Sequence, residues 1–236
     1  MPSPRAHTLR FTGPSGEVVA IALTTGLVAG WTGRDRDAVE RHIEELAALG
    51  VPPPSRVPLY YRVAASLFTN EGQIQVVGDS SSGEVEPALL DDGERLWLGL
   101  GSDHTDRDLE SHSVALAKQV CAKPLAPGVW PFAEVAGHLD RLELRAWIRQ
   151  PDSDWTPYQS GTLAALRPLA ELIRGAPPGA HAPQRLAPGC VMLCGTLPVL
   201  DGSIRPAAAF RMALTDPLLG REIRHEYRIE TLPAVR

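Results

Sequence analysis

Two glutamates one residue apart, Glu84 and Glu86, lie in the segment SGEVEPALL, whose other residues are typical of a buried strand. Residues i and i+2 of a strand point to the same face, so this pattern places two carboxylates side by side. Like charges at that separation repel each other. We therefore expect either that this face meets water or that a positive charge lies between the two side chains.

A third acid, Asp103, lies in the segment GSDHTDRDLE, where a predicted strand ends and a predicted helix begins. Such junctions often expose functional side chains. Three carboxylates supply hard oxygen ligands, which suit Mg²⁺, Mn²⁺ or Ca²⁺ better than zinc. The pattern thus predicts that Glu84, Glu86 and Asp103 bind a divalent ion. The ordinary alternatives remain open, namely a solvated strand face for the glutamates and a helix cap for Asp103 or Asp106.

The elements that must position these acids are mostly strands. Residues 34–50 carry the clearest helical pattern, which Asp35 or Asp37 can cap. Pro87 cannot donate a hydrogen bond in a sheet, so the strand that contains Glu86 is predicted to be an edge strand or to be bulged. The remaining predicted elements are a hairpin at 8–23, a strand at 26–33, strands within 57–102, helices at 106–119 and 162–175, and strands at 142–150, 190–198, 208–216 and 221–232.

Strands dominate this order, and three helices are interspersed without a regular strand-helix-strand alternation. This arrangement favours a β-rich α+β fold over a doubly wound one. We expect a small N-terminal hairpin region at residues 1–30 and a main domain at 31–236, or a single continuous domain over 1–236.

The composition excludes several classes of partner. The chain of 236 residues has a net charge of −5 and no long basic run, which argues against nucleic acid and anionic membranes. Residues 1–13 lack the apolar core of a signal peptide, and no apolar run approaches the roughly 20 residues that cross a bilayer. Cys190 and Cys194 have apolar neighbours, so we expect buried free thiols and a cytoplasmic location.

Several segments, in this order along the chain, resemble the motifs of the fumarylacetoacetate hydrolase family. The resemblance covers roughly residues 30–232 and implies the family's fold, a mixed β-sheet roll or barrel with a few peripheral helices. The matching segments are the His-x-x-Glu of His42 to Glu45, EVEPALL, SDHTDRDLE, the lysine-containing LAKQVCAKPLAPGVWP, YQSG and LCGTLP.

The resemblance also implies roles for particular residues. Glu84, Glu86 and Asp103 would bind the metal, with Mg²⁺ as the first choice and Mn²⁺ or Ca²⁺ as alternatives. His42 and Glu45, spaced i, i+3 on one helix face, would activate a water molecule. Lys118 would stabilise an anionic oxygen. The positions that would contact the substrate are Arg107, Glu110, Gln159 and Thr196, and Glu110 replaces the glutamine usual in the family.

The resemblance implies hydrolysis of a carbon–carbon bond in a small diketo or 2-oxo acid substrate, by a homodimer. Three other reactions of 2-oxo acids remain open on this scaffold, namely decarboxylation, isomerisation and hydration. A non-catalytic small-molecule binding module with the same fold is a further alternative. The His42–Glu45 pair is the feature that favours hydrolysis over decarboxylation, because decarboxylation needs no activated water.

Overall fold

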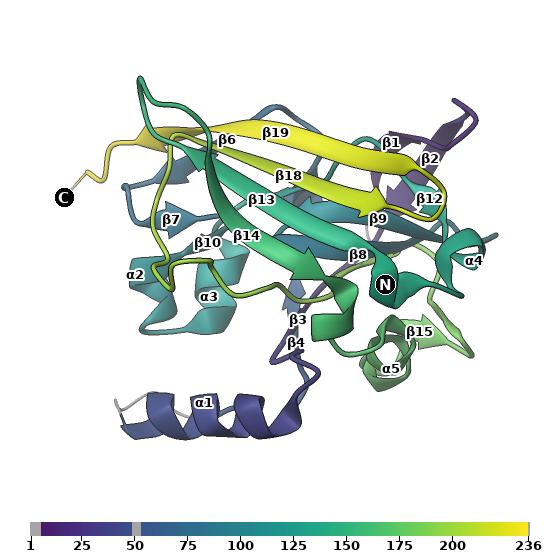
Figure 1. Cartoon of the computed structure of the whole chain (residues 1–236), viewed down its shortest axis with the longest axis horizontal. Coiled ribbons are helices and arrows are strands. Elements are labelled where there is room, and N and C mark those ends of the chain that lie inside the picture. Colours follow the sequence, from purple (N-terminus) through teal and green to yellow (C-terminus); the bar gives the residue numbers. More distant parts are fainter. Residues whose placement is uncertain (1–5, 49–52, 236) are drawn as a thin grey trace.

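Two β-sheets lie face to face in the computed structural model, which describes residues 6–48 and 53–235 without the side chains of His42, Glu45 and Leu46 (Figure 1). The larger sheet has the spatial order β12 (Trp130–Pro131), β9 (Leu96–Ser102), β8 (Val85–Asp91), β17 (Cys190–Leu193), β3 (Thr25–Gly30) and β4 (Leu59–Val63). The smaller has the order β14 (Thr156–Thr162), β13 (Glu143–Arg149), β18 (Ala209–Asp216), β19 (Arg221–Leu232) and β6 (Gln73–Val77).

Neighbouring strands in both sheets are antiparallel except for the β17–β3 and β19–β6 pairs, which are parallel. Strand residues make up 44% of the chain and helical residues 18%. The predicted class, a β-rich α+β fold with mixed sheets, is therefore confirmed.

The larger sheet is covered on both faces. One face packs against the smaller sheet through a core that includes Leu89, Leu98, Met212 and Tyr227. The other face packs against the hairpin of β1 (His7–Thr12) and β2 (Val18–Leu23), whose Ile21 is wholly buried. Burial on both faces explains why β8, β9 and β17 are almost continuously apolar instead of alternating.

The predicted hairpin is confirmed, and β3 joins the larger sheet directly after it. Whether residues 1–30 form a separate domain stays a prediction. The smaller strand pairs are β5 (Phe68–Thr69) with β11 (Lys123–Pro124), β7 (Ser81–Ser82) with β10 (Thr105–Asp106), and β15 (His181–Ala182) with β16 (Arg185–Leu186).

The helices are short and peripheral. The longest, α1 (Arg36–Ala48), lies beyond the ends of β3 and β4 (Figure 1). Asp35 caps it, because the Asp35 carboxylate accepts the N–H of Ala38 at 3.1 Å. The others are α2 (Arg107–Glu110), α3 (Val114–Gln119), α4 (Phe132–Val135) and α5 (Leu169–Gly175), with 3₁₀ turns η1 (Ala65–Leu67), η2 (Leu139–Arg141) and η3 (Leu163–Ala165).

Two of the three helix predictions needed correction. The helix predicted at 106–119 is two helices, because the Ser113 side chain caps a new start at α3. The helix predicted at 162–175 is only α5, because Pro168 is its N-cap residue and the chain before it forms the end of β14 and η3.

The prediction that Pro87 marks an edge or bulged strand was wrong. β8 lies between β9 and β17 in the interior of the sheet, and its register with β9 is continuous. The Pro87 carbonyl accepts the N–H of Cys194, in the chain that follows β17. The nitrogen and carbonyl of one strand residue point to the same neighbouring strand, so the proline nitrogen also faces β17. β17 ends at Leu193, directly before that contact. The missing N–H therefore falls where the ladder ends, and its loss costs little.

The hairpin of β18 and β19 closes on a buried carboxylate, Asp216. This carboxylate accepts the N–H groups of Leu218 and Leu219 at 3.1 Å and lies 3.1 Å from the His138 Nε2 atom. Burial alone would raise the pKa of Asp216, but these partners lower it. Ionised Asp216 therefore stabilises the folded protein above the unfolded-state pKa of about 4. This contribution is lost as the pH falls through the pKa of Asp216 in the folded protein.

Asp216→Ala is expected to lower the free energy of unfolding at pH 7 by about 2–3 kcal/mol, because it leaves His138 and two N–H groups without their acceptor. Urea denaturation at pH 7 measures this loss. Asp201→Ala is the matched control: this exposed aspartate also accepts a loop N–H and pairs with Arg205, and its loss should cost much less than the loss of Asp216. Equal losses in the two variants would contradict the prediction.

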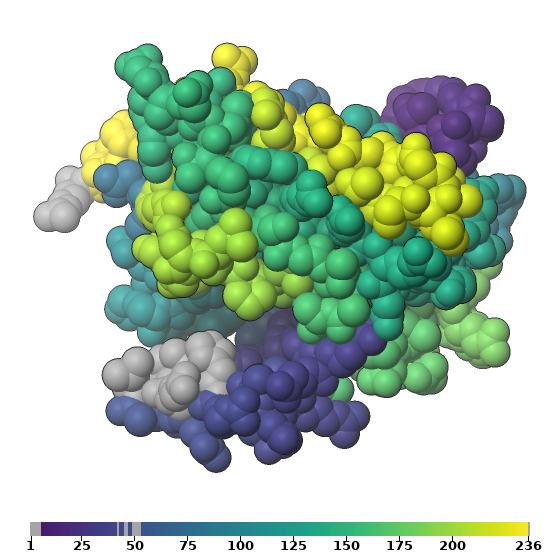
Figure 2. All heavy atoms as spheres, viewed as in Figure 1, coloured from purple at the N-terminus to yellow at the C-terminus, as the bar shows by residue number. Residues whose placement is uncertain are grey.

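Within the described part of the chain, no helix combines the length and the apolar character needed to cross a membrane. Cys121, Cys190 and Cys194 are free and buried, as predicted for the last two. The outer face of β13, β18 and β19 forms much of the surface in Figure 2. Arginine and glutamate side chains alternate there with buried residues, and Arg211 pairs with Glu226 across two strands.

Candidate metal centre

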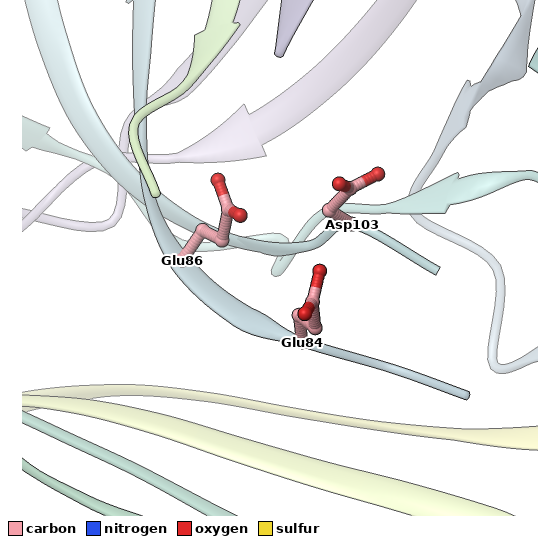
Figure 3. Close-up of side chains that lie close together, drawn as sticks. All are labelled: Glu84, Glu86 and Asp103. Atoms are coloured by element: carbon pink, nitrogen blue, oxygen red, sulfur yellow. The ribbon is translucent and has the colours of Figure 1, made fainter. Parts of the chain in front are cut away.

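The β8–β9 hairpin brings the three predicted ligands together. Glu84 directly precedes β8, Glu86 lies in it, and Asp103 directly follows β9. Antiparallel pairing of Val85 with Ser102 puts the start of one strand beside the end of the other, and the Asp103 N–H donates to the Glu84 carbonyl at 3.0 Å. One carboxylate oxygen from each acid lies within 4.8 Å of the others. Figure 3 shows the three side chains close together.

Burial makes this cluster of acids unusual. Glu86 and Asp103 are 2% and 0% exposed, and Glu84 is half-buried. Burial, followed by the charges of Asp103 and Glu84, raises the pKa of Glu86 well above its ordinary value. Burial also raises the pKa of Glu84, against the opposing charges of Arg107 and Lys118. The protein holds acids here that repel each other, so a cation between them would be strongly favoured.

Two buried lysines flank the third acid. The Lys118 Nζ atom, from α3, donates to the Asp103 Oδ2 atom, and the Lys123 Nζ atom lies 3.1 Å from Oδ1. Burial alone would raise the pKa of Asp103, but the two ammonium groups bring it below its ordinary value. Asp103 is therefore ionised at neutral pH. Burial lowers the pKa of Lys123, whereas Asp103 and Glu84 raise that of Lys118 against the effect of burial.

The sequence interpretation assigned a role to Lys118 but none to Lys123, which lies only five residues further on. Lys123 is wholly buried in β11 and also donates to the carbonyl of His104. An isolated lysine in a loop-rich segment has no sequence pattern that marks it as buried. Only the parallel pairing of β11 with Phe68 and Thr69 of β5 places its side chain against Asp103.

His104 is the second residue that sequence reasoning missed. Its ring nitrogens lie 2.9 Å from the Ser81 hydroxyl and 3.1 Å from the Tyr227 hydroxyl. Burial, together with the charges of Lys123 and Arg107, lowers the pKa of His104 to about 3, so the imidazole is neutral. The ring therefore fixes the backbone beside Asp103 and does not serve as a solvent-exposed base.

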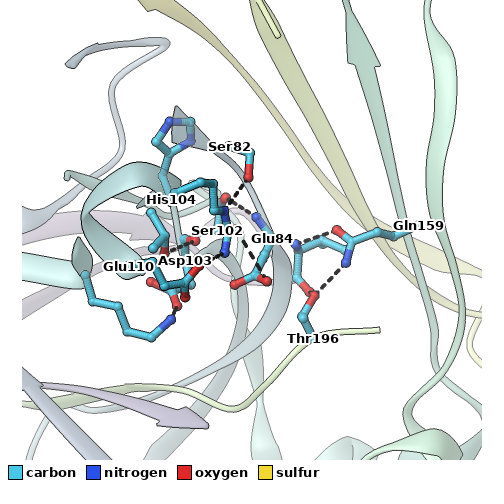
Figure 4. A network of polar contacts seen from close by, with 12 residues as sticks. Ser82, Glu84, Ser102, Asp103, His104, Glu110, Gln159 and Thr196 are labelled. Carbon is cyan, nitrogen blue, oxygen red and sulfur yellow. Dashed lines mark hydrogen bonds and ion pairs between the residues drawn. The ribbon is translucent and has the colours of Figure 1, made fainter. Parts of the chain in front are cut away.

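The predicted substrate residues on α2 are tied to the acids. Arg107 donates to the Ser82 hydroxyl at 2.7 Å and to Glu110 at 2.8 Å, and it pairs with Glu84 at 3.4 Å (Figure 4). Asp106 caps α2 by accepting the N–H of Leu109. Because the Glu110 carboxylate is paired with Arg107, it neutralises part of the guanidinium charge. The guanidinium therefore holds Glu84 in place, and a substrate anion would have to compete with two carboxylates for it.

The other two predicted substrate residues hold the start of β8. The Gln159 side chain, from β14, accepts the Val85 N–H at 3.0 Å and donates to the Thr196 hydroxyl at 2.8 Å (Figure 4). The Thr196 hydroxyl in turn donates to the Val85 carbonyl at 2.8 Å. Gln159 is buried, whereas Thr196 is half-buried. Both residues lie at the site, and their hydrogen bonds join the smaller sheet to the strand that carries Glu86.

Gly195, in the turn after β17, donates its N–H to the Glu86 Oε2 atom at 2.7 Å. Its φ of +96° is left-handed, and a Cβ atom there would lie 1.6 Å from the Thr32 hydroxyl oxygen. Gly195→Ala is therefore expected to destabilise the protein by at least about 2 kcal/mol in thermal unfolding. Gly202→Ala is the control, since its φ of +71° carries a similar backbone cost with no atom within 4 Å. Equal losses in both variants would contradict the steric argument.

His42 and Glu45 belong to α1, but their side chains lie outside the described residues. Their predicted role as a water-activating pair stays a prediction. The structure thus brings together eight of the ten predicted site residues, namely Glu84, Glu86, Asp103, Arg107, Glu110, Lys118, Gln159 and Thr196.

The donor set fits a divalent cation. Three carboxylates converge within 4.8 Å, and all of their donor atoms are hard oxygens. Four carboxylates against three cationic side chains leave one net negative charge in the cluster before an ion is added. These seven residues are Glu84, Glu86, Asp103, Glu110, Arg107, Lys118 and Lys123. A divalent ion would relieve the repulsion that the sequence pattern pointed to.

Two solved structures resemble this chain. One is described as the apo form of 2-keto-3-deoxy-D-arabinonate dehydratase, with a TM-score of 0.60 and 14% identity over 89% of this chain and 74% of that one. The other is a crystal structure of Cg1458, with a TM-score of 0.59 and 13% identity over 97% of this chain and 89% of that one. Both have the fumarylacetoacetate hydrolase fold, and at these identities the likeness shows the fold alone.

A comparison with the curated proteins finds no match. The fold predicted from the sequence resemblance is thus the fold of the two structural neighbours. A family model described as protein of unknown function (DUF2848) matches residues 29–227, and the chain belongs to that family.

Proposed function

We propose that this protein is a divalent-metal-dependent enzyme, a divergent relative of the fumarylacetoacetate hydrolase family, that acts on a small 2-oxo acid or 1,3-dicarbonyl compound. The observation that carries the proposal is the buried triad of Glu84, Glu86 and Asp103 with two lysines against one of its members. A structural ion would not need buried lysines beside a ligand, whereas an enzyme that stabilises an anionic intermediate would use them.

Glu84, Glu86 and Asp103 would hold the ion, preferably Mg²⁺ with Mn²⁺ or Ca²⁺ as alternatives, and the ion would supply Lewis-acid chemistry. Lys118 is 6% exposed and Lys123 is wholly buried, so Lys118 is the lysine that a substrate oxygen can approach. We assign to Lys118 the stabilisation of negative charge as it develops on that oxygen. Arg107 and Gln159 would keep Glu84 and β8 in position, and Thr196 would contact the substrate carboxylate.

We further propose that the reaction is hydrolysis of a carbon–carbon bond, with His42 and Glu45 activating the water. Glu45→Gln is expected to reduce kcat about 100-fold or more and leave Mg²⁺ affinity unchanged, because the residue would orient a base and bind no metal. Glu44→Gln, on the exposed side of the same helix, is the control. Full activity in Glu45→Gln would remove the dyad from the mechanism.

A second candidate is a lyase that removes water from a 2-oxo sugar acid, an alternative from the hydratase class. It is favoured by the structural neighbour described as 2-keto-3-deoxy-D-arabinonate dehydratase. This reaction needs no activated water, so activity that survives Glu45→Gln, with a dehydrated product found by mass spectrometry, would select it over hydrolysis.

The first test is titration of Mg²⁺ and Mn²⁺ into chelator-stripped protein, followed by assays with acylpyruvates and 2-oxo sugar acids. We expect saturable binding to one site and turnover of at least one substrate class. Binding without turnover would favour a non-catalytic small-molecule binding module. Absence of binding would overturn the metal-dependent proposal.

We also propose a cytoplasmic homodimer without nucleic-acid or membrane partners. The free buried cysteines support a reducing compartment, and the net charge of −5 disfavours polyanionic partners. Light scattering coupled to gel filtration would measure the mass in solution against the 25.4 kDa of one chain.

A further inference from the structure

An aromatic pair, Trp31 and Tyr61, lies beside the buried cluster. The Lys118 Nζ atom, which contacts Asp103, lies 5.7 Å from the centroid of the Tyr61 ring. The charges of Lys118, Glu110 and Asp103 all act on the Tyr61 hydroxyl. Both aromatic residues are half-buried, whereas Asp103 and Lys118 are almost wholly buried. The pair therefore borders the cluster through Lys118 and is partly open to solvent.

Trp31 has a backbone conformation that a bulky residue seldom adopts. Its φ is +59°, in the left-handed region that disfavours side chains with a Cβ atom. Such conformations persist only where the surroundings enforce them, and they are common at ligand sites. The mechanism described above makes no use of this residue, so the conformation calls for a separate explanation.

Contacts on both sides of Trp31 enforce this conformation. Before it, β3 pairs with β4 up to Gly30 and Leu59. After it, the Thr32 carbonyl accepts the Arg167 N–H at 2.7 Å, and the Arg34 N–H donates to the Ala165 carbonyl at 2.9 Å. The chain is anchored one residue to each side, so the direction of the indole is set by the fold.

The two aromatic side chains are joined to each other and to the site. The Trp31 and Tyr61 side chains lie close to each other, and the Tyr61 ring comes within 3.1 Å of where a Cβ atom on Gly30 would lie. Thr32, the residue after Trp31, packs against Gly195, whose N–H holds Glu86. The loop that carries Trp31 thus touches the turn that positions a proposed metal ligand.

The half-buried residues around the cluster differ in character. Glu84, Arg107 and Glu110 form a charged part that two ion pairs hold together. Trp31 and Tyr61 form an aromatic part. A substrate whose oxo-acid end lies at the triad extends outward past one of these parts. An apolar tail is excluded from paired charges by desolvation and is favoured against aromatic rings.

We infer that Trp31 and Tyr61 form the wall that receives the substrate tail and that they select an aromatic or planar unsaturated tail over a short aliphatic one. This inference rests on the proposed function and specifies its substrate class. The indole contributes a flat apolar surface, and the backbone anchors on both sides of Trp31 limit the movement of that surface. Preorganisation of this kind lowers the entropy lost on binding.

The test compares benzoylpyruvate with acetylpyruvate in the Mg²⁺-loaded enzyme. Wild type is expected to prefer the aryl substrate in kcat/KM. Trp31→Ala is expected to lose about tenfold or more on benzoylpyruvate and less than about threefold on acetylpyruvate, since only the aryl tail uses the indole face. Trp31→Phe should recover most of the loss, because it restores a ring at the same place.

Trp155→Ala is the matched control for removing a tryptophan. Trp155 stacks on Arg149 and Arg211, away from the acids, and its loss should leave both substrates unchanged. A second readout avoids dependence on turnover and on variants that fold poorly: calorimetry of phenylpyruvate and pyruvate binding to wild type and Trp31→Phe, with tighter binding of phenylpyruvate expected in both.

Two contrary outcomes separate this inference from the proposed function. Turnover of both substrates with equal kcat/KM in wild type, unchanged in Trp31→Ala, would overturn the aromatic wall and leave the metal-dependent enzyme in place. If wild type neither binds nor turns over any of the four compounds, the inference and the acylpyruvate form of the proposed function fall together, although Mg²⁺ titration still reports on the metal site.

Discussion

Glu84→Gln/Glu86→Gln is expected to abolish Mg²⁺ binding and to lower kcat/KM by about 1,000-fold or more. Loss of groups that only support metal ligands typically costs 10- to 100-fold, so loss of two of three anionic ligands should cost more. Calorimetric titration of chelator-stripped protein measures the binding. The substitution keeps the size of both side chains, and a glutamine oxygen can still accept the N–H of Gly195 that Glu86 accepts now.

The double variant should remain folded, because it removes two neighbouring carboxylates, one buried and one half-buried, that repel each other. Without metal, its melting temperature is expected to equal or exceed that of the wild type. Added Mg²⁺ should raise the melting temperature of wild type only, since a ligand stabilises the state that binds it.

The matched control is Glu143→Gln/Glu222→Gln, two glutamates on the outer face of the smaller sheet. This control should bind Mg²⁺ as wild type does. Unchanged Mg²⁺ affinity in Glu84→Gln/Glu86→Gln would show that the triad holds no metal, and the proposed function would lose its main support.

Lys123→Met is expected to lower the free energy of unfolding of the metal-free protein by about 3 kcal/mol. The substitution keeps the length of the side chain but removes the ammonium group that lies 3.1 Å from Asp103 and donates to the His104 carbonyl. Removing one partner of a buried ion pair costs more than the pair itself contributes, because the other charge stays buried without full compensation. Urea denaturation with chelator present measures the change.

A double-mutant cycle separates the ion pair from the packing of the lysine stem. The loss of stability in Lys123→Met/Asp103→Asn should be smaller than the sum of the losses in the two single variants, because either substitution alone already removes the Lys123–Asp103 contact. If the two substitutions add without any interaction free energy, Lys123 does not act through Asp103. Lys118→Met offers a comparison: its ammonium group contacts the same carboxylate, but the side chain is 6% exposed, so water can replace part of the interaction and a smaller loss is expected.

The elements that the sequence predicted well have strong local signals. The hairpin of β1 and β2 follows from alternating residues around a glycine-containing turn, and α1 follows from its helical periodicity and the Asp35 cap. One prediction that failed had no local cause. A proline within a strand predicts an edge position, as it did for Pro87. An interior strand tolerates Pro87 because the neighbouring strand β17 ends at Leu193, which the sequence around Pro87 does not reveal.

The sequence by itself determined that three acids could bind a cation, because the i, i+2 spacing of Glu84 and Glu86 on a strand is a local geometric property. It also determined the β-rich class of the fold. The tertiary structure decided which cations face these acids. Lys123 meets Asp103 through a parallel strand pair, and Trp31 meets Tyr61 through the pairing of β3 with β4. Contacts of this kind depend on sheet order, and sheet order is set by long-range packing that no short stretch of sequence encodes.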